Sequence, residues 1–382
     1  MVFRMNLDEL RSGIDEVDRE LLRLFLRRMQ LVQEVASYKS AHNLPIYQPK
    51  REEALLEHIG QLAGERYSTP ARMLFAAIMD ISKALQHHEA GNKGALSALL
   101  AKAAACPEPI ESQAAVACQG VRGAYSYLAA AHLVQDPERI CYDRFSDVCD
   151  AVRGGDCRYG VLPLENSSAG SVGEVYDLLS RGGLYIIKSY DLRVTHCLLG
   201  IPGARAEEVR MVYSHPQALS QCSEFFSRNR QIDAVPCTNT AVAAQEVARQ
   251  QDPARAALAH EECAALYGLN ILQAGVQNND NNQTRFILVS KTPAVYPDAH
   301  RIALMLRTAH TPGSLYRVMS RFAAQGLNIT KIESRPIPEQ PFEFMFFFEF
   351  DGNVAAPEVR TLLQSLDNES GTFCFLGNYP LR

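Results

Sequence analysis

The segment between Gly13 and Pro45 contains neither glycine nor proline, and this constrains the N-terminal fold more than any other feature of the chain. With no helix breaker and with apolar residues at helical spacing, the segment predicts one helix from about Leu7 to Ala41. The spaced residues are Leu10, Ile14, Val17, Leu21, Leu24, Phe25, Val32 and Val35. A helix of this length is unusual in a small globular domain, and it favours a helix that is shared between subunits.

Two further helices and a linker follow. Pro45 ends the first helix, and Pro49 suits the first turn of the second one. A third helical stretch runs from about Pro70 to His87. The next segment, residues 91–112, is rich in alanine and contains glycine and proline, which is typical of a linker that could be helical in part.

After the linker the pattern changes to short β-rich runs that alternate with helical stretches, which predicts an α/β domain over residues 113–292. The predicted strands are Ala114–Cys118, Tyr159–Leu164, Leu184–Lys188, Val209–Tyr213 and Phe286–Ser290. The predicted helices include Tyr125–Val134, Gln217–Arg228 and Thr240–Arg249.

Residues 299–382 form a third region, in which strands and helices follow the β-α-β-β-α-β order of a ferredoxin-like fold. The predicted elements are Arg301–Arg307, Gly313–Ala324, Asn328–Ser334, Phe342–Phe350, Pro357–Leu366 and Thr372–Leu376. The run that starts at Phe342 shows little alternation, which indicates a strand that is buried on both faces or paired at an interface.

The composition narrows the possible functions. At 382 residues the chain is long enough for two or three domains, and its net charge of −5 argues against nucleic acid as the main partner. No apolar run is long enough to span a bilayer, and the N-terminus lacks the apolar core of a signal peptide. Ten cysteines without a Cys-x-x-Cys pair favour reduced thiols in a cytoplasmic enzyme. Dinucleotide, phosphate-loop and zinc-protease motifs are absent, so neither a cofactor nor a metal is expected.

Several cations of the helical region can be placed relative to one another. At about 100° per residue, Arg28 and Lys39 lie within about 20° of each other on the first helix. Arg11 lies about 26 Å further along that axis and roughly 100° round it, so it cannot reach the same small ligand. If all three bind one substrate, Arg11 must come from a neighbouring chain. Ser82 and Gln86 share a face of the third helix. The alternative is that all of these are solvated groups on amphipathic helices.

Leu10-Arg11, Arg27-Arg28, Lys39, Arg51-Glu52 and Ser82-x-x-x-Gln86 resemble, in register, the all-helical chorismate mutase family over residues 1–90. The resemblance implies a homodimer with intertwined helices in which both chains contribute to each site. It implies the following substrate contacts: Arg11 of the partner, Arg28 and Arg51 to the carboxylates, Lys39 and Gln86 to the ether oxygen, Glu52 to the ring hydroxyl, and further contacts from Ser82 and Gln48. Gln48 stands where members often carry aspartate. The rearrangement needs no nucleophile, only a compact substrate conformer and donors where negative charge develops.

Polar clusters follow the predicted strands of the α/β region, where ligands of such domains usually bind. They are Gly120-x-x-Gly123-Ala-Tyr-Ser126, Leu164-Glu165-Asn166-Ser167, His196-Cys-Leu-Leu, Ser214-His-Pro-Gln-Ala, Leu266-Tyr-Gly-Leu and Thr284-Arg285-Phe286. Taken singly, each has a structural interpretation. Ser214 and Thr240 could be ordinary helix caps, and Arg285 could be a structural ion-pair partner.

Together and in this order, the clusters resemble the prephenate dehydratase family. The resemblance implies two α/β lobes around a central cleft, similar to periplasmic binding proteins, and the conversion of prephenate to phenylpyruvate. It implies that Thr284 acts at the leaving hydroxyl, because hydroxide is a poor leaving group that needs a hydrogen-bond donor. Glu165, Asn166, Ser214 and Gln221 would orient the substrate and that donor. We hypothesise that Arg285 helps to bind a carboxylate.

The C-terminal region resembles the ACT regulatory domain of dehydratases, whose matching segments bind phenylalanine between paired domains. The positions that match are Gly313, Ser314, Leu315, Asn328, Glu333, Ser334, Arg335 and Pro336. Ser314 replaces the usual alanine. Feedback inhibition would follow if phenylalanine favours a less active dimeric arrangement. The alternative is a small dimerisation domain without an effector.

The sequence thus predicts a multidomain cytosolic enzyme of phenylalanine synthesis with chorismate mutase (1–90), linker (91–112), dehydratase (113–292) and ACT (299–382) parts. Its expected small-molecule partners are chorismate, prephenate and L-phenylalanine, with no nucleic acid and no membrane. One alternative keeps the mutase but uses arogenate as the dehydratase substrate. Another is a ligand-sensing protein with two lobes and no catalytic activity.

Overall fold

The computed structural model describes residues 6–42, 44, 47–90, 95–105, 109–308, 310–311, 313–337, 340, 343–369 and 372–381. Pro45, the glycines of the linker, Pro107 and Phe342, which entered the sequence predictions, lie outside these ranges. The chain forms two compact units. Unit 1 comprises 1–101, 306–329 and 354–373, and unit 2 comprises 102–305, 330–353 and 374–382.

Unit 1 is helical. It contains α1 (Leu7–Ala41), α2 (Pro49–Leu62), α3 (Gly64–Ala90), α12 (Ser314–Ala324) and α13 (Pro357–Glu369), and α4 (Ala95–Ala105) runs from this unit into the next. The single long helix predicted from the N-terminal pattern is confirmed, at 35 residues. It begins at a capping box, in which the Asn6 side chain accepts from the Glu9 N–H and the Glu9 carboxylate accepts from the Asn6 N–H.

The predicted start of the third helix at Pro70 is wrong. Helix α3 begins at Gly64, and Pro70 lies inside its second turn. Gly64 has a φ of +68°, a conformation that glycine adopts without penalty, so the chain reverses immediately after α2 and resumes helical geometry. The alanine-rich segment that follows contains the helix α4, in agreement with a linker that is partly helical.

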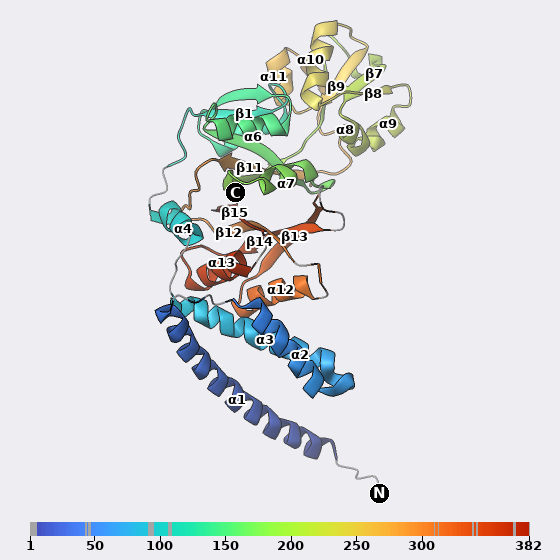
Figure 1. The fold of residues 1–382 in the computed structure, drawn as a ribbon. Helices are drawn as coiled ribbons and strands as arrows, with labels where there is room; N and C mark the ends of the chain where they lie inside the picture. The colour runs from blue at the N-terminus through green and yellow to red at the C-terminus, as the bar shows by residue number, and fades with distance from the viewer. Residues whose placement is uncertain are drawn as a thin grey trace. The chain divides into compact units, whose positions relative to one another are not determined.

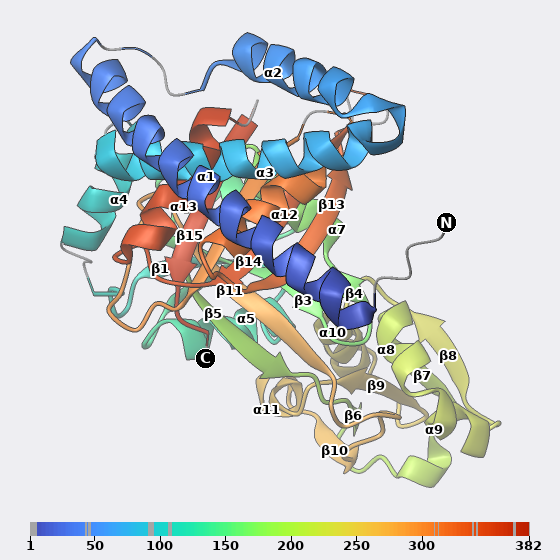
Figure 2. The same ribbon diagram turned by 90° about the horizontal axis from the view of Figure 1, so that it is seen from below.

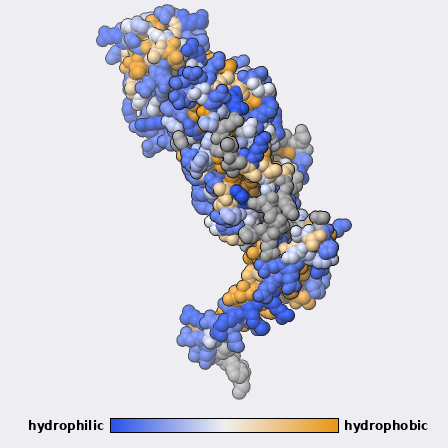
Figure 3. All heavy atoms as spheres, turned by 90° about the vertical axis from the view of Figure 1, so that its left-hand side faces the viewer, coloured by the Kyte–Doolittle hydropathy of each residue, from blue (hydrophilic) through white to orange (hydrophobic). Residues whose placement is uncertain are grey.

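Most of the apolar face of α1 is exposed in the single chain. Leu10, Ile14, Val17 and Leu21 have exposed fractions between 47% and 59%, and the buried residues of the helix are confined to its second half. Orange, apolar atoms accordingly appear on the surface of the helical part at the bottom of Figure 3. An exposed apolar face of this kind marks an interaction surface.

The α/β part of unit 2 has two lobes, each with its own sheet (Figure 1). In the first lobe the strand order is β2-β1-β3-β11-β5, and the short β4 pairs with β3. Its elements are β1 (Ala115–Gln119), α5 (Tyr125–Leu133), β2 (Glu138–Tyr142), α6 (Phe145–Gly154), β3 (Tyr159–Asn166), β4 (Gly170–Ser171), α7 (Gly173–Ser180), β5 (Tyr185–Arg193) and β11 (Gln283–Ser290).

In the second lobe the strand order is β10-β6-β9-β7-β8. Its elements are β6 (Cys197–Gly200), a 3₁₀ turn (Ala206–Glu208), β7 (Met211–Ser214), α8 (Pro216–Gln221), α9 (Ser223–Arg228), β8 (Asp233–Pro236), α10 (Thr240–Gln250), β9 (Arg255–Ala259), α11 (Glu262–Tyr267) and β10 (Asn270–Gln273). The predicted helix Gln217–Arg228 is in fact two helices, because the fully buried Cys222 leaves helical geometry between them.

The chain enters the second lobe after β5 and returns as β11, which lies antiparallel between β3 and β5 (Figure 2). Strand β11 is therefore placed at the point where the chain passes between the lobes. The five strands predicted for the α/β region are all present, with ends that shift by a few residues.

A third sheet has the order β13-β14-β12-β15, from β12 (Arg301–Arg307), β13 (Ile329–Pro336), β14 (Phe344–Asp351) and β15 (Thr372–Tyr379). With α12 and α13 between the strands in sequence, the predicted β-α-β-β-α-β order is confirmed. Phe347, Phe348 and Phe350 are fully buried, as the lack of alternation indicated. Within unit 2 this sheet shares a core with the first lobe, where Phe347 packs edge-on against Tyr176 at 4.9 Å between ring centroids.

Candidate functional site

Strand β11 brings Thr284 directly opposite Asn166, the last residue of β3. The Asn166 side-chain amide donates to Thr284 Oγ1 at 2.8 Å and to Asn282 Oδ1 at 2.9 Å. Its oxygen accepts from the backbone N–H groups of Ser168 and Ala169. Asn166 is therefore held from both ends of its amide. Because Thr284 Oγ1 accepts this bond, its own proton remains available to donate to a ligand.

Glu165 and Arg285, the neighbours of that pair, are both engaged in ion pairs. Glu165 Oε2 lies 2.9 Å from Lys331 Nζ, and Arg285 binds both carboxylate oxygens of Asp191 at 2.9 and 3.2 Å. Arg285 also lies 3.6 Å from the buried Glu349 of β14. Burial alone would lower the pKa of Arg285, but Asp191 and Glu349 raise it above its ordinary value. The substrate contact of Arg285 stays a prediction, since its guanidinium already has two partners.

A second polar cluster joins Tyr125 of the first lobe to residues of the second lobe. His196 Nε2 lies 3.0 Å from Gln221 Oε1, and Tyr125 donates to the Thr195 carbonyl with its oxygen 3.4 Å from His196 Nδ1. Ser214 is fully buried and donates to the Leu258 carbonyl at 2.7 Å. Ser214 and Gln221, the residues predicted to act from the second lobe, are thus each held by a hydrogen bond within the protein.

The structural interpretations of Ser214 and Thr240 as helix caps are wrong. Helix α8 is capped by His215, whose Nδ1 accepts from the Gln217 N–H. Helix α10 is capped by Asn239, whose Oδ1 accepts from the Val242 N–H at 2.8 Å. Ser214 ends β7 instead, and Thr240 is the first helical residue.

Sequence reasoning missed three residues that hold the predicted ones in place. Asn282 is buried and binds Asn166, while His196 and Tyr125 form the cluster around Gln221. A signal existed for each. Asn282 ends a run of polar residues just before a buried strand, and His196 and Tyr125 both occur in quoted motifs but were not assigned a role.

Burial lowers the pKa of His196 below its ordinary value, although the hydrogen bond that the ring makes to Gln221 Oε1 opposes this. In the unfolded chain the imidazole takes up a proton below about pH 6.5, whereas in the folded chain it resists protonation. Stability should therefore fall as the pH drops below about 6.5, by at most about 1.4 kcal/mol per pH unit from this residue. Urea unfolding between about pH 5 and pH 7 should show a shallower pH slope for His196→Gln than for the wild type. His300→Gln, at an exposed histidine, is the control, and equal slopes for all three would contradict this assignment.

In unit 1 the structure brings together several of the residues predicted to bind a substrate. Arg28 Nη1 donates to Ser82 Oγ, which joins α1 to α3. Burial lowers the pKa of Lys39 below its ordinary value, and the nearby charge of Glu52 offsets this only in part. Gln86 is buried, and its Oε1 has no hydrogen-bond partner among the described residues. A buried amide oxygen without a hydrogen-bond partner is rare in folded proteins.

The other predicted residues of the helical region are Arg11 on α1 and Gln48 and Arg51 at the start of α2. Arg11 is 67% exposed at its side chain and pairs with Asp8 at 3.7 Å. Gln48 is the N-cap of α2, but its side chain makes no capping bond, as its departure from aspartate suggested. Arg51 is exposed on the first turn of α2.

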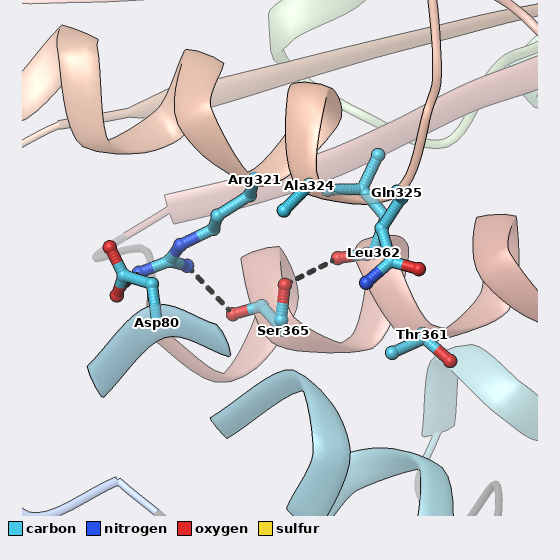
Figure 4. A pocket seen from close by; sticks show the side chains of 7 residues that line it. All are labelled: Asp80, Arg321, Ala324, Gln325, Thr361, Leu362 and Ser365. Atoms are coloured by element: carbon cyan, nitrogen blue, oxygen red, sulfur yellow. Dashed lines mark hydrogen bonds and ion pairs between the residues drawn. The ribbon is translucent and has the colours of Figure 1, made fainter. Parts of the chain in front are cut away.

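A buried charge network runs from this group to the C-terminal helices of the same unit. Lys83 Nζ lies 3.1 Å from Glu52 and 3.0 Å from Asp80. On the other side of Asp80, Arg321 of α12 lies at 3.5 Å and donates to the Ser365 carbonyl of α13 (Figure 4). This network was not predictable from local sequence patterns, because it depends on how α3, α12 and α13 pack.

The residues predicted to bind an effector fall in both units. In unit 1, Ser314 is buried and donates to the Thr311 carbonyl at 2.7 Å, between the N-cap Gly313 and Leu315 of α12. Asn328 is exposed just before β13. In unit 2, Ser334 and Pro336 are exposed on β13, and Glu333 and Arg335 alternate with them on its other face.

Within the described ranges, no group of three or more His, Cys, Asp or Glu side chains is placed to hold a metal ion. None of the described helices combines the length and the apolar character needed to cross a membrane. Of the nine cysteines in the described part, all are free thiols and six are buried.

Two family models match the chain. The prephenate dehydratase model covers residues 116–294, and the chorismate mutase type II model covers residues 10–87. A bifunctional chorismate mutase/prephenate dehydratase of Enterobacter agglomerans is 33% identical, over 97% of this chain and 95% of that protein. The arogenate dehydratase/prephenate dehydratase 2 of Arabidopsis thaliana is 35% identical, over 71% of this chain and 74% of that protein.

Two solved structures resemble about 70% of the chain. The prephenate dehydratase of Arthrobacter aurescens, solved with L-Phe, has a TM-score of 0.65 at 28% identity, over 70% of this chain and 90% of its own. A protein described as a quorum-quenching acylase, GqqA, also has a TM-score of 0.65, at 32% identity over 70% of this chain and 98% of its own. The two-lobed fold is thus that of the prephenate dehydratases. With the helical module at its N-terminus, the chain belongs to the family of bifunctional chorismate mutase/prephenate dehydratases.

Proposed function

We propose that this chain rearranges chorismate to prephenate in its helical module and converts prephenate to phenylpyruvate in its two-lobed module. The observation that carries the second activity is the Asn166–Thr284 pair, which leaves the threonine proton free at the end of two central strands. The relative from Enterobacter agglomerans, similar over nearly the whole length of both chains, supports the combination of the two activities.

In the dehydratase reaction the carboxylate leaves as CO₂, and its bonding electrons enter the ring as the hydroxyl departs as hydroxide, which takes up a proton from solvent to become water. Thr284 donates a hydrogen bond to that hydroxyl, which makes it a better leaving group. The bond from Asn166 orients the threonine oxygen so that its proton points away from the protein partner. Ser214 and Gln221, from the second lobe, orient the substrate. Glu165 orients it next to the Asn166–Thr284 pair. Arg285 is a candidate to bind a carboxylate of the substrate.

The mutase reaction needs a bound dianion and donors at the ether oxygen. Arg28 and Arg51 bind the carboxylates, while Lys39 and Gln86 donate to the ether oxygen. Glu52 accepts from the ring hydroxyl, with Ser82 and Gln48 at the edge of the site. The contact between Arg28 and Ser82 supports a polar site at this position.

A homodimer completes the mutase site. Arg11 lies on the exposed half of α1 together with the uncovered apolar residues, so a second copy that covers this face would bring its own Arg11 with it. An isologous contact of this kind places one residue from each chain in each of two equivalent sites.

The C-terminal module is an ACT-type domain that senses L-phenylalanine. The complex of the Arthrobacter aurescens relative with L-Phe supports this assignment. The effector residues are Gly313, Ser314, Leu315, Asn328, Glu333, Ser334, Arg335 and Pro336. Inhibition follows if phenylalanine binds one arrangement of the paired domains better than the other.

We propose a cytosolic enzyme that needs no cofactor, and a coupled assay without added cofactor tests its function. The purified chain is given chorismate, prephenate or arogenate, with and without phenylalanine, and phenylpyruvate and phenylalanine are measured. Turnover of chorismate and prephenate is expected. A preference for arogenate would mean that arogenate, not prephenate, is the dehydratase substrate. The name of the Arabidopsis thaliana relative includes both activities. Lack of turnover of all three would leave a sensing protein without catalysis.

Glu333→Ala should weaken feedback inhibition, because it removes a carboxylate from the proposed effector site. The phenylalanine concentration that halves dehydratase activity should rise by about tenfold or more, which corresponds to about 1.4 kcal/mol of lost binding. Glu333 also accepts a hydrogen bond from Ser171, so Ser171→Ala is the matched control that removes this bond from the other side. An equal change in both variants would assign the effect to that bond and not to the effector.

A further inference from the structure

Strand β13 presents three charged residues at alternate positions. Lys331, Glu333 and Arg335 are partly covered, whereas the residues between them are exposed. Side chains alternate along a strand, so the three lie on one face, here called the charged face of β13. All three contact the first lobe of the dehydratase within unit 2.

Lys331 binds at the end of β3. Its Nζ lies 2.9 Å from Glu165 Oε2 and donates to Ser171 Oγ at 3.1 Å. Ser171 in turn donates to Glu333 Oε2 at 2.9 Å. Because Glu165 and Ser171 are cross-strand partners of β3 and β4, the ammonium group contacts both strands of that pair.

The rest of the charged face is fixed independently. Arg335 donates to both carboxylate oxygens of Asp177 on α7, at 3.1 Å each. This bidentate geometry fixes the orientation of the guanidinium relative to the carboxylate. Gly173, at the start of α7, leaves room for this side chain, since a Cβ there would lie 2.7 Å from Arg335 Nη2. Strand β13 is thus held on the lobe at a second point.

Glu165 precedes Asn166, whose amide orients the Thr284 hydroxyl. A free carboxylate at this point has many rotamers and would repel a substrate that carries two carboxylates. The Lys331 side chain is 13% exposed, so water screens its charge only weakly. It therefore offsets the charge of Glu165 and restricts its rotamers.

We infer that Lys331 is a positioning residue of the dehydratase site, which the C-terminal sheet supplies to hold Glu165 in its working orientation. This inference rests on the proposed role of Glu165. Lys331 acts through that carboxylate and makes no contact of its own with the reacting atoms. The competing explanation is that the ion pair only joins the sheet to the lobe.

Kinetics of the full-length chain with prephenate test the inference. Lys331→Met should lower kcat by about tenfold and raise KM, while Lys331→Arg should keep kcat within about threefold of the wild type. Lys291→Met is the matched control, because Lys291 is an exposed lysine of the first lobe, directly after β11. The mutase activity of the same chain and its thermal unfolding report on folding. If Lys331→Met does not fold, Lys331→Gln takes its place, since it keeps a donor without the charge.

A double-mutant cycle separates positioning from simple joining. In a Glu165→Gln background, Lys331→Met should change kcat/KM by less than about twofold, because the group it acts through is gone. Equal effects of Lys331→Met in both backgrounds, or unchanged kcat and KM in Lys331→Met itself, would overturn the inference. A wild-type chain inactive on prephenate would instead refute the proposed function, which the same assay shows first.

Discussion

Thr284→Ala should lower the rate of phenylpyruvate formation from prephenate by about 100-fold or more, while the rate of chorismate rearrangement stays within about twofold. The substitution removes the hydroxyl whose proton the Asn166 bond leaves available at the start of β11. Separate steady-state assays with chorismate and with prephenate measure the two rates. The mutase rate should not respond, because its proposed residues lie in unit 1 and Thr284 lies in unit 2.

Thr284→Ser is the matched variant, because it keeps the hydroxyl and removes only the methyl group. It should retain most of the dehydratase rate. Equal loss of both activities in Thr284→Ala would contradict separate sites, and equal loss in the alanine and serine variants would show that packing at this position matters more than the hydroxyl.

Arg28→Ala should have the converse effect, with mutase turnover lowered by about 100-fold or more and dehydratase turnover preserved. Arg28 is partly buried and bound to Ser82, so its guanidinium is held where a carboxylate can form a charge-assisted bond. Arg23→Ala, on the same helix at a side chain that is 76% exposed, is the control. Comparable losses in the two arginine variants would place the site elsewhere.

Mixing inactive Arg11→Ala and Arg28→Ala chains should restore mutase activity if the site is shared. Random exchange gives half heterodimers, each with one intact site, so about one quarter of the wild-type activity is expected. The rate of chorismate loss before and after subunit exchange measures this. No recovery, with exchange confirmed by a labelled chain, would count against a site that is shared between chains.

Local patterns predicted the elements that depend on sequence neighbours. The helix α1 follows from the absence of breakers, and the alternation of strands and helices follows from the change in periodicity. The start of α3 was missed because a proline was taken as the first residue of the helix, whereas a glycine turn precedes it. The break at Cys222 was missed because an amphipathic pattern continues across it.

The partners of the predicted site residues were not predictable, since they come from segments distant in sequence. Asn166 and Thr284 were both identified, but their hydrogen bond depends on the register of β3 against β11. Arg285 was assigned to a substrate with a structural ion pair as the alternative, but the sequence could not identify Asp191 and Glu349 as its partners. Such pairings follow from strand order, which local periodicity does not encode.

The charged face of β13 has a consequence for how the protein can change by mutation. Glu333 and Arg335 belong to the proposed effector site, yet they also hold Ser171 and Asp177 of the catalytic lobe. Strains selected to overproduce phenylalanine through changes at these two positions should therefore have a lower dehydratase turnover. Second-site suppressors that recover growth should arise on the lobe, at the residues that face this strand, and natural descendants should exchange the two sets together.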